Sequence, residues 1–407
     1  MTKIYDAIVL GAGVAGSAAA KLLADRGWHT ALVDRHRFPR HKVCGEFLSP
    51  ESQGTLARLG LLEEVKSLSP SAITRTSMHM RGGGVVSLAL PGKALGVSRF
   101  LLDEKLHRAA EAAGAEAREG VTVTAVTRQG EHYAVLVRAG DRTEELLARS
   151  VIGAWGGAGL SYGERGEEGD TSNDAPKKRK GAPKSSSVGV KMHYRIRSPK
   201  AAEAMTEAAA RPDAVELYFF RGGYLGLNAV EDGKVNVAAL LDRADIPAKH
   251  RTVAAMLEEA IRRHPALEAR MAGLLPIMGS AAAVSPFRVG LRPVPWNGMP
   301  LIGDAICRIP PLCGDGMSMA LRSAELCGKF ADRYLRGELT VEQWEREYGA
   351  AVASEFAGPL RWGRVAHSLL ASPVLSYALP LIARLAPGAA SGMVRATRLR
   401  NPAIVES

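Results

Sequence analysis

A run of small residues near the start of the chain has the spacing of a phosphate-binding turn. The segment 11–16 reads Gly-Ala-Gly-Val-Ala-Gly, follows an apolar run and precedes a helix expected over 17–27. Gly11 permits a tight turn, Gly13 has no Cβ to block a diphosphate, and Gly16 lets the helix pack closely on the strand. The N-terminus of this helix offers free N–H groups and a positive dipole end. The pattern predicts a dinucleotide site.

An acidic residue completes this fingerprint. Asp34 ends a second apolar run, 30–34, and follows Gly11 by 23 positions (34 − 11). At the end of a strand its carboxylate is placed to accept hydrogen bonds from the ribose hydroxyls of an adenosine. A glycine-rich turn without a ligand is the alternative, but the complete order of strand, turn, helix, strand and acid argues against it.

The elements around these residues indicate a mixed α/β chain. Alternating apolar residues separated by turn signals, such as the triplet 231–233 (Glu-Asp-Gly), predict an antiparallel sheet. The expected strands of this sheet are 188–194, 215–219, 223–228 and 235–240. The segment 161–187 is rich in charge and glycine and has almost no aliphatic residues, so we expect a disordered loop there.

Composition restricts the class of protein. The 407 residues are 46% apolar and 23% charged, which is typical of a globular chain with two or three domains. The cysteines lack the spacing of metal ligands and no signal peptide precedes them, so we expect a reduced, cytoplasmic protein without a metal. These cysteines are Cys44, Cys307, Cys313 and Cys327.

The net charge of +11 is concentrated near the C-terminus. The segment 356–400 has no Asp or Glu, and a basic surface of this kind predicts peripheral contact with an anionic membrane or an acidic substrate. Pro373 and Pro380 interrupt the uncharged stretch 365–383, so a membrane-spanning helix is not expected. The sequence has no basic-aromatic motif of the kind that binds nucleic acid, so a nucleic-acid partner is not expected. The arginines of the segment are Arg361, Arg364, Arg384, Arg395, Arg398 and Arg400.

The glycine fingerprint followed by Cys44-Gly45-Glu46 resembles the geranylgeranyl reductase family. That family is part of the flavoprotein superfamily that includes para-hydroxybenzoate hydroxylase and the flavin-dependent halogenases. The resemblance implies an α/β fold with a discontinuous Rossmann-like FAD-binding domain, an inserted antiparallel β-sheet substrate domain and a C-terminal helical region. The expected boundaries are 1–70, 93–158 and 285–340 for the FAD-binding domain, 71–92 and 188–284 for the substrate domain, and 341–407 for the helical region.

A second pair of motifs narrows the cofactor to FAD. Gly303-Asp304 ends an apolar strand, and a glycine turn at 314–316 opens another helix. In the resembled fold Asp304 binds a ribityl hydroxyl, and the helix N-terminus at Gly316 and Met317 stabilises negative charge on the N1–C2=O edge of reduced flavin. The residues expected to contact the cofactor are Gly11, Ala12, Gly13, Val14, Ala15, Gly16, Asp34, Arg35, Arg99, Gly303, Asp304, Gly314, Gly316 and Met317.

The sequence also departs from the resembled families. Trp155 stands where related hydroxylases carry an aspartate. Tyr224 is kept from the Tyr-x-Trp-x-Phe-Pro stretch of geranylgeranyl reductases, but Gly226 and Asn228-Ala229 replace the bulky aromatic residue and the proline. We therefore expect a substrate pocket of different shape.

The leading hypothesis is reduction of a carbon-carbon double bond in an apolar isoprenoid- or polyketide-like substrate by hydride transfer from reduced flavin. Cys44 and Glu46 are candidates for steering or proton delivery, and Tyr224 for the substrate pocket. A buried small residue and a salt-bridged surface acid are the alternative interpretations of the first two. No motif remains for a separate NAD(P)H domain, so NAD(P)H or a partner protein must donate electrons transiently.

Two other functions remain open. An FAD-dependent monooxygenase acting on an aromatic or polyketide substrate would use the same fold, although Trp155 counts against it. A halogenase is disfavoured because the Trp-x-Trp-x-Ile-Pro signature is missing from the sequence. A flavin-binding, membrane-associated protein without catalysis is the third possibility.

Overall fold

The structure is a computed structural model that describes residues 3–157, 187–197, 213–247, 251–287, 289 and 292–371, together with 385, 388, 392 and 395–399. The expected disordered loop at 161–187 lies outside the described residues except for its last position.

The first sheet carries the glycine turn at the end of its central strand. Its order is β6-β2-β1-β9-β8-β7, and β1 pairs in parallel with both β2 and β9. Strands β7, β8 and β9 form an antiparallel meander at one edge. The strands are β1 (Ile4–Leu10), β2 (Thr30–Asp34), β6 (Glu116–Glu119), β7 (Thr122–Gln129), β8 (His132–Ala139) and β9 (Arg142–Gly153).

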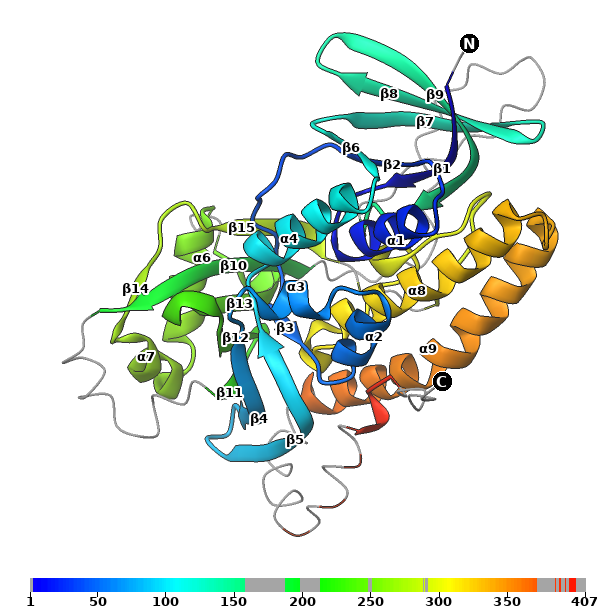
Figure 1. The fold of residues 1–407 in the computed structure, drawn as a ribbon. Helices are drawn as coiled ribbons and strands as arrows, with labels where there is room; N and C mark the ends of the chain where they lie inside the picture. Colours follow the sequence, from blue (N-terminus) through cyan, green and yellow to red (C-terminus); the bar gives the residue numbers. More distant parts are fainter. Residues whose placement is uncertain are drawn as a thin grey trace.

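Helices α1 (Val14–Asp25), α4 (Arg99–Ala112) and α8 (Gly316–Leu335) accompany this sheet (Figure 1). Except for Ile4, the apolar residues of β1 are buried, and so are most of those of α1, as expected of a parallel strand and the helix that covers it. The shorter helices α2 (Ser52–Arg58) and α3 (Leu62–Lys66) lie beside α8 and α4. Together these elements enclose the larger apolar core.

The second sheet has the order β14-β10-β13-β12-β11-β4-β5-β3, with β15 also paired to β10. Most neighbours are antiparallel, as the sequence predicts, but β11 and β4 are parallel. The chain enters the second sheet twice, first with β4 and later with β11. The connection between these two parallel strands is therefore a long crossover and not a hairpin. The strands are β3 (Phe47–Leu48), β4 (Ser71–His79), β5 (Val85–Gly96), β10 (Ser187–Ile196), β11 (Ala214–Phe220), β12 (Gly223–Ala229), β13 (Val235–Asp242), β14 (Leu274–Pro276) and β15 (Ala282–Phe287).

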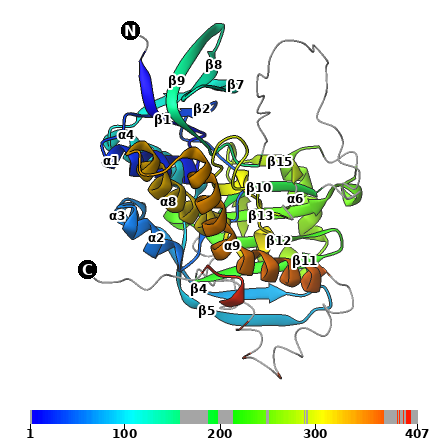
Figure 2. The same cartoon turned by 90° about the vertical axis from the view of Figure 1, so that its right-hand side faces the viewer.

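Helices α6 (Val253–Arg262) and α7 (Pro265–Met271) pack on one face of the second sheet and close a smaller core. The long helix α9 (Val341–Ala371) runs from α8 toward the other face, where its final turns lie over the sheet (Figure 2). Leu370 from these turns packs against the buried cluster of Met80, Phe219 and Tyr224. The expected α/β architecture, with an FAD-type Rossmann domain and a sheet domain, is confirmed. Among the described residues, no helix is long and apolar enough to span a bilayer.

Candidate active site

The glycine turn has the close packing that its sequence predicts. Gly11 has φ +112°, and a Cβ atom there would lie 2.5 Å from the carbonyl oxygen of Ala154. A Cβ atom on Gly16 would lie 1.7 Å from the carbonyl oxygen of Gly11. Because both neighbours are backbone atoms, neither clash can be relieved by moving a side chain. The two glycines therefore let α1 and β9 meet the end of β1.

Asp34 holds this turn from the end of β2. Its Oδ2 accepts a hydrogen bond from the backbone N–H of Ala12 at 2.8 Å, and its Oδ1 accepts one from His36 at 2.8 Å. Burial alone would raise the pKa of Asp34, but the backbone N–H of His36, the charge of Arg40 and the N–H of Ala12 together lower it. Asp34 is therefore an ionised acceptor beside the predicted adenosine site, whereas the neighbouring Arg35 is exposed.

Two cations border the open side of the turn. A Cβ atom on Gly13 would lie 3.7 Å from Nη2 of Arg99 and 3.9 Å from Nζ of Lys42. Asp103 neutralises Arg99 through hydrogen bonds of 2.6 and 2.7 Å. In the described part of the chain, no carboxylate lies within ion-pairing distance of Lys42, and burial followed by the charge of Arg99 lowers the pKa of Lys42 to about 8. A cation without a counter-ion beside a phosphate-binding turn fits the diphosphate of FAD.

The later motifs lie next to the first one. Ile302 donates a backbone hydrogen bond to the carbonyl oxygen of Gly153, the last residue of β9, at 2.9 Å. Gly303 has φ +63°, and a Cβ atom there would lie 3.0 Å from Cβ of Ala15 in α1. Asp304 follows and pairs with Arg308 at 3.6 Å. Residues nearly three hundred positions apart thus share one end of the parallel sheet.

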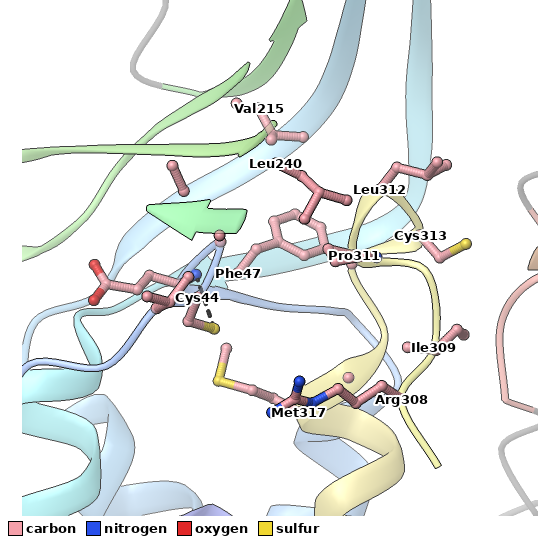
Figure 3. A pocket seen from close by; sticks show the side chains of 18 of the residues that line it. Cys44, Phe47, Val215, Leu240, Arg308, Ile309, Pro311, Leu312, Cys313 and Met317 are labelled. Atoms are coloured by element: carbon pink, nitrogen blue, oxygen red, sulfur yellow. Dashed lines mark hydrogen bonds between the residues drawn. The ribbon is translucent and has the colours of Figure 1, made fainter. Parts of the chain in front are cut away.

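A cavity of about 540 Å³ extends from these motifs to the second sheet. Gly13, Gly303, Asp304 and Met317 line its cofactor side, and apolar side chains line the rest. Figure 3 shows Phe47, Leu240 and Leu312 gathered around this space, with Cys44 and Met317 nearby. The other apolar lining residues include Met78, Met80, Val86, Leu88, Leu90, Val215, Leu217, Leu369 and Leu370.

Cys44 lies between the cofactor side and the apolar side of the cavity. Its Sγ accepts a hydrogen bond of 3.3 Å from the backbone N–H of Glu46 (Figure 3). Burial raises the pKa of the Cys44 thiol, and the nearby charge of Arg99 offsets only part of this rise. The group is therefore a protonated thiol at neutral pH.

Glu46 is fully buried, and hydrogen-bond donors contact both of its carboxylate oxygens. Its Oε1 accepts hydrogen bonds from Nζ of Lys191 at 2.8 Å and the backbone N–H of Arg99 at 3.0 Å, and its Oε2 lies 2.6 Å from Nε2 of His193. Burial would raise the pKa of Glu46, but His193 and Lys191 lower it. An ionised carboxylate with three partners anchors the loop between the domains. The salt bridge agrees with the alternative interpretation of Glu46, but the expected surface position is wrong because the side chain is buried.

The sequence analysis did not single out Lys191, His193 or Lys42. Lys191 and His193 are two residues apart on β10 and share one face of its buried central part. Polar residues at alternate positions of a strand expected to be buried could have indicated a buried partner. The sequence does not identify that partner, because Glu46 is about 150 residues away. Lys42 was part of a basic run whose side chains could all have faced solvent.

The residues that differ from the resembled families lie in the cavity or next to it. Tyr224 is buried and lines the cavity, and its ring is tilted by 36° against that of Phe219, with centroids 5.7 Å apart. Gly226 also lines the cavity, and a Cβ atom there would lie only 3.2 Å from Cδ2 of Leu217. Asn228 donates to the carbonyl oxygen of Glu46 at 3.3 Å. Trp155 packs against the core of the cofactor domain, beside Gly153.

The residues present fit FAD. Gly13, Lys42 and Arg99 would hold the diphosphate, Asp34 would bind the adenosine ribose, and Asp304 would bind the ribityl chain. Gly316 and Met317 begin α8 and line the same cavity, so the N-terminus of this helix would meet the flavin ring. No group of His, Cys, Asp or Glu side chains in the described residues could hold a metal ion.

Comparison with known proteins agrees with this geometry. Residues 4–206 match the family described as FAD binding domain. A menaquinone reductase from Mycobacterium tuberculosis is 26% identical over 339 residues, which cover 80% of this chain and 76% of that protein. A digeranylgeranylglycerophospholipid reductase from Methanopyrus kandleri is 23% identical over 355 residues, with coverage of 85% and 83%. The solved structure of a myxobacterial, FAD-dependent chondrochloren halogenase has a TM-score of 0.73 at 22% identity and covers 96% of this chain and 90% of that one.

The fold and the site thus define an FAD-dependent oxidoreductase. The resemblance to geranylgeranyl reductases is confirmed by relatives of that kind that align over most of the chain. The likeness to the halogenase concerns the fold alone.

Proposed function

We propose that this protein reduces a carbon-carbon double bond of an apolar, isoprenoid- or polyketide-like substrate. Reduced FAD, when bound, supplies the hydride. The observation that carries the proposal is the continuity of the cavity: the space beside Met317 and Gly303 opens directly into one lined by apolar side chains from the second sheet and from α9. A substrate seated there would lie against the cofactor without crossing solvent.

The composition of the cavity favours a long apolar substrate. Its wall comes from alternate positions of β4, β5 and β11, and the end of α9 covers it with Leu369 and Leu370. Flexible methionines, Met78 and Met80, line the same wall and can adapt to an irregular chain. The relatives named for menaquinone and for digeranylgeranylglycerophospholipid carry names of isoprenoid compounds, which supports this class of substrate.

The proton that completes the reduction is proposed to come from Cys44. Its thiol is protonated, lines the cavity and lies near the cofactor side. Glu46 is a less suitable donor because its ionised carboxylate is already engaged by Lys191, His193 and the backbone of Arg99. We therefore assign Glu46 to positioning the loop that carries Cys44, while Tyr224 shapes the far part of the cavity.

The electron donor and the cellular setting follow from the same proposal. NAD(P)H or a partner protein would reduce the flavin during a transient visit, since the motifs found account for FAD alone. An isoprenoid substrate partitions into membranes, so peripheral contact through the basic C-terminal region remains part of the proposal. We expect no nucleic-acid partner.

Anaerobic reoxidation tests the proposal. The purified holoprotein is reduced with dithionite and mixed either with a polyprenyl substrate or with oxygen, while flavin absorbance and products are followed. Fast reoxidation by the alkene with formation of the saturated product supports the reductase. Fast reoxidation by oxygen with a hydroxylated product would support the monooxygenase, and no turnover with any acceptor would leave a flavin-binding protein without catalysis.

A further inference from the structure

A buried charge cluster joins the C-terminal segment to the start of α8. Nη1 of Arg398 donates to Oδ1 of Asp315 at 2.5 Å and lies 3.7 Å from Oε1 of Glu51. Asp315 is fully buried, and the side chains of Arg398 and Glu51 are 10% and 8% exposed. The guanidinium also lies 5.7 Å from the ring centroid of Phe47, which lines the cavity. The sequence analysis placed Arg398 in a basic surface, but the structure places it inside the protein.

The location of this cluster connects it with the cofactor. Asp315 immediately precedes α8, whose first residues, Gly316 and Met317, line the cavity. Arg398 lines the same cavity. Asp315 does not cap α8, since its side chain accepts no hydrogen bond from the first turn. Its charge is therefore directed toward Arg398.

The charges in the cluster do not balance when all groups are ionised. Two carboxyl groups face one guanidinium. Burial and the neighbouring Glu51 raise the pKa of Asp315 well above its ordinary value, and the charge of Arg398 opposes this rise. The remaining titratable neighbour is Cys313, a thiol whose pKa burial raises to about 12. Oδ2 of Asp315 and Oε1 of Glu51 are buried without a hydrogen-bond partner in the described structure. Removing Arg398 would leave two uncompensated carboxyl groups at the helix end expected to meet the flavin.

We propose that Arg398 is a positioning residue that neutralises Asp315 and Glu51 and thereby keeps the N-terminus of α8 favourable for the negative charge of reduced flavin. The C-terminal segment is then part of the cofactor site and sets its reduction potential. This inference rests on the proposed function only in placing the N1–C2=O edge of the flavin at Gly316 and Met317.

Dye-coupled reduction of the holoprotein tests this proposal without any substrate. Arg398→Met should lower the ratio of reduced to oxidised flavin at a fixed potential by about tenfold, the effect of one charge at roughly 10 Å with an effective dielectric constant of about 20. Arg398→Lys should keep most of the wild-type ratio. Asp315→Asn should raise the ratio and, combined with Arg398→Met, should restore it toward the wild-type value. Arg395→Met, which removes an exposed charge from the same segment, is the matched control.

Three results would overturn the proposal: a wild-type ratio in Arg398→Met, an equal shift in Arg395→Met, or an Arg398→Met shift that Asp315→Asn does not reduce. If Arg398→Met does not fold, the rise expected in Asp315→Asn alone decides the question. Failure to reduce an alkene would refute the proposed function and leave these ratios unchanged. A normal alkene reductase with unaltered ratios would refute only the inference about Arg398.

Discussion

Replacement of Lys42 by methionine should change cofactor affinity and apoprotein stability in opposite directions. The ammonium group lies beside Gly13 with no carboxylate partner in the described structure, so the FAD diphosphate is its expected counter-ion. A hydrogen bond to a charged group contributes about 1.5–3 kcal/mol. Loss of the ammonium should therefore weaken FAD binding by roughly 10- to 150-fold, at 1.4 kcal/mol for each factor of ten.

The apoprotein should respond with the opposite sign. The pKa of Lys42 falls from 10.5 to about 8 on folding, so the unfolded chain binds more protons between these values. The free energy of unfolding of the apoprotein should then rise with pH from about 8 to 10.5. At pH 7, Lys42→Met should stabilise the apoprotein by about 2 kcal/mol, a value reduced for the part of the side chain that solvent reaches.

Fluorescence titration with FAD from pH 6.5 to 9.5 and urea unfolding of the apoprotein measure these two effects. The wild-type affinity should be greatest below pH 8 and fall above it, because the apoprotein loses the ammonium proton that the diphosphate requires. The methionine variant should lack this fall, Lys42→Arg should bind FAD within a few-fold of wild type, and Lys93→Met, at an exposed position, should match wild type. Equal FAD affinity in Lys42→Met and wild type would refute the reasoning.

Three further substitutions separate the roles of the neighbouring residues. Cys44→Ala should retain FAD and lose turnover in the alkene assay, whereas undiminished turnover would remove Cys44 from the mechanism. Lys191→Met should lower the free energy of unfolding by about 3–5 kcal/mol because the Glu46 carboxylate loses a buried partner. Urea titration measures this free energy. If the two side chains form a direct pair, the double variant with Glu46→Gln should regain part of the lost stability. Gly226→Phe should fill part of the cavity and raise KM for long polyprenyl substrates while FAD titration stays normal; an unchanged KM would place the substrate elsewhere.

The cofactor end of this protein was predictable because its signals are local. A turn that needs glycine at 11 and 16, and a carboxylate at the end of the next strand, are determined by a few neighbouring backbone atoms. The glycine turn before α8 is another local signal. These features have fixed spacing, so the sequence alone indicates both their structure and their ligand.

The second sheet and the substrate end of the cavity depend on contacts between residues that are far apart in the sequence, and the spacing of residues does not predict such contacts. The parallel pairing of β11 with β4 arises from two separate visits to one sheet. Glu46 meets Lys191 and His193 only after the domains have packed, and Arg398 meets Asp315 across 83 positions. A charged residue looks the same in sequence whether it faces solvent or a buried partner. Its environment therefore has to be read from the fold.

The connector from β2 to β3 links these two ends. Within five residues, Lys42 faces the diphosphate side, Cys44 lines the cavity, and Glu46 binds Lys191 and His193 of the second sheet. Five extended residues span at most about 17 Å, so fixing both ends restricts what lies between them. Glu46 is fixed by buried partners, whereas we expect Lys42 to gain its counter-ion only when FAD binds. We therefore expect the cofactor to complete the placement of Cys44, which makes FAD binding a structural requirement for proton delivery as well as the source of hydride.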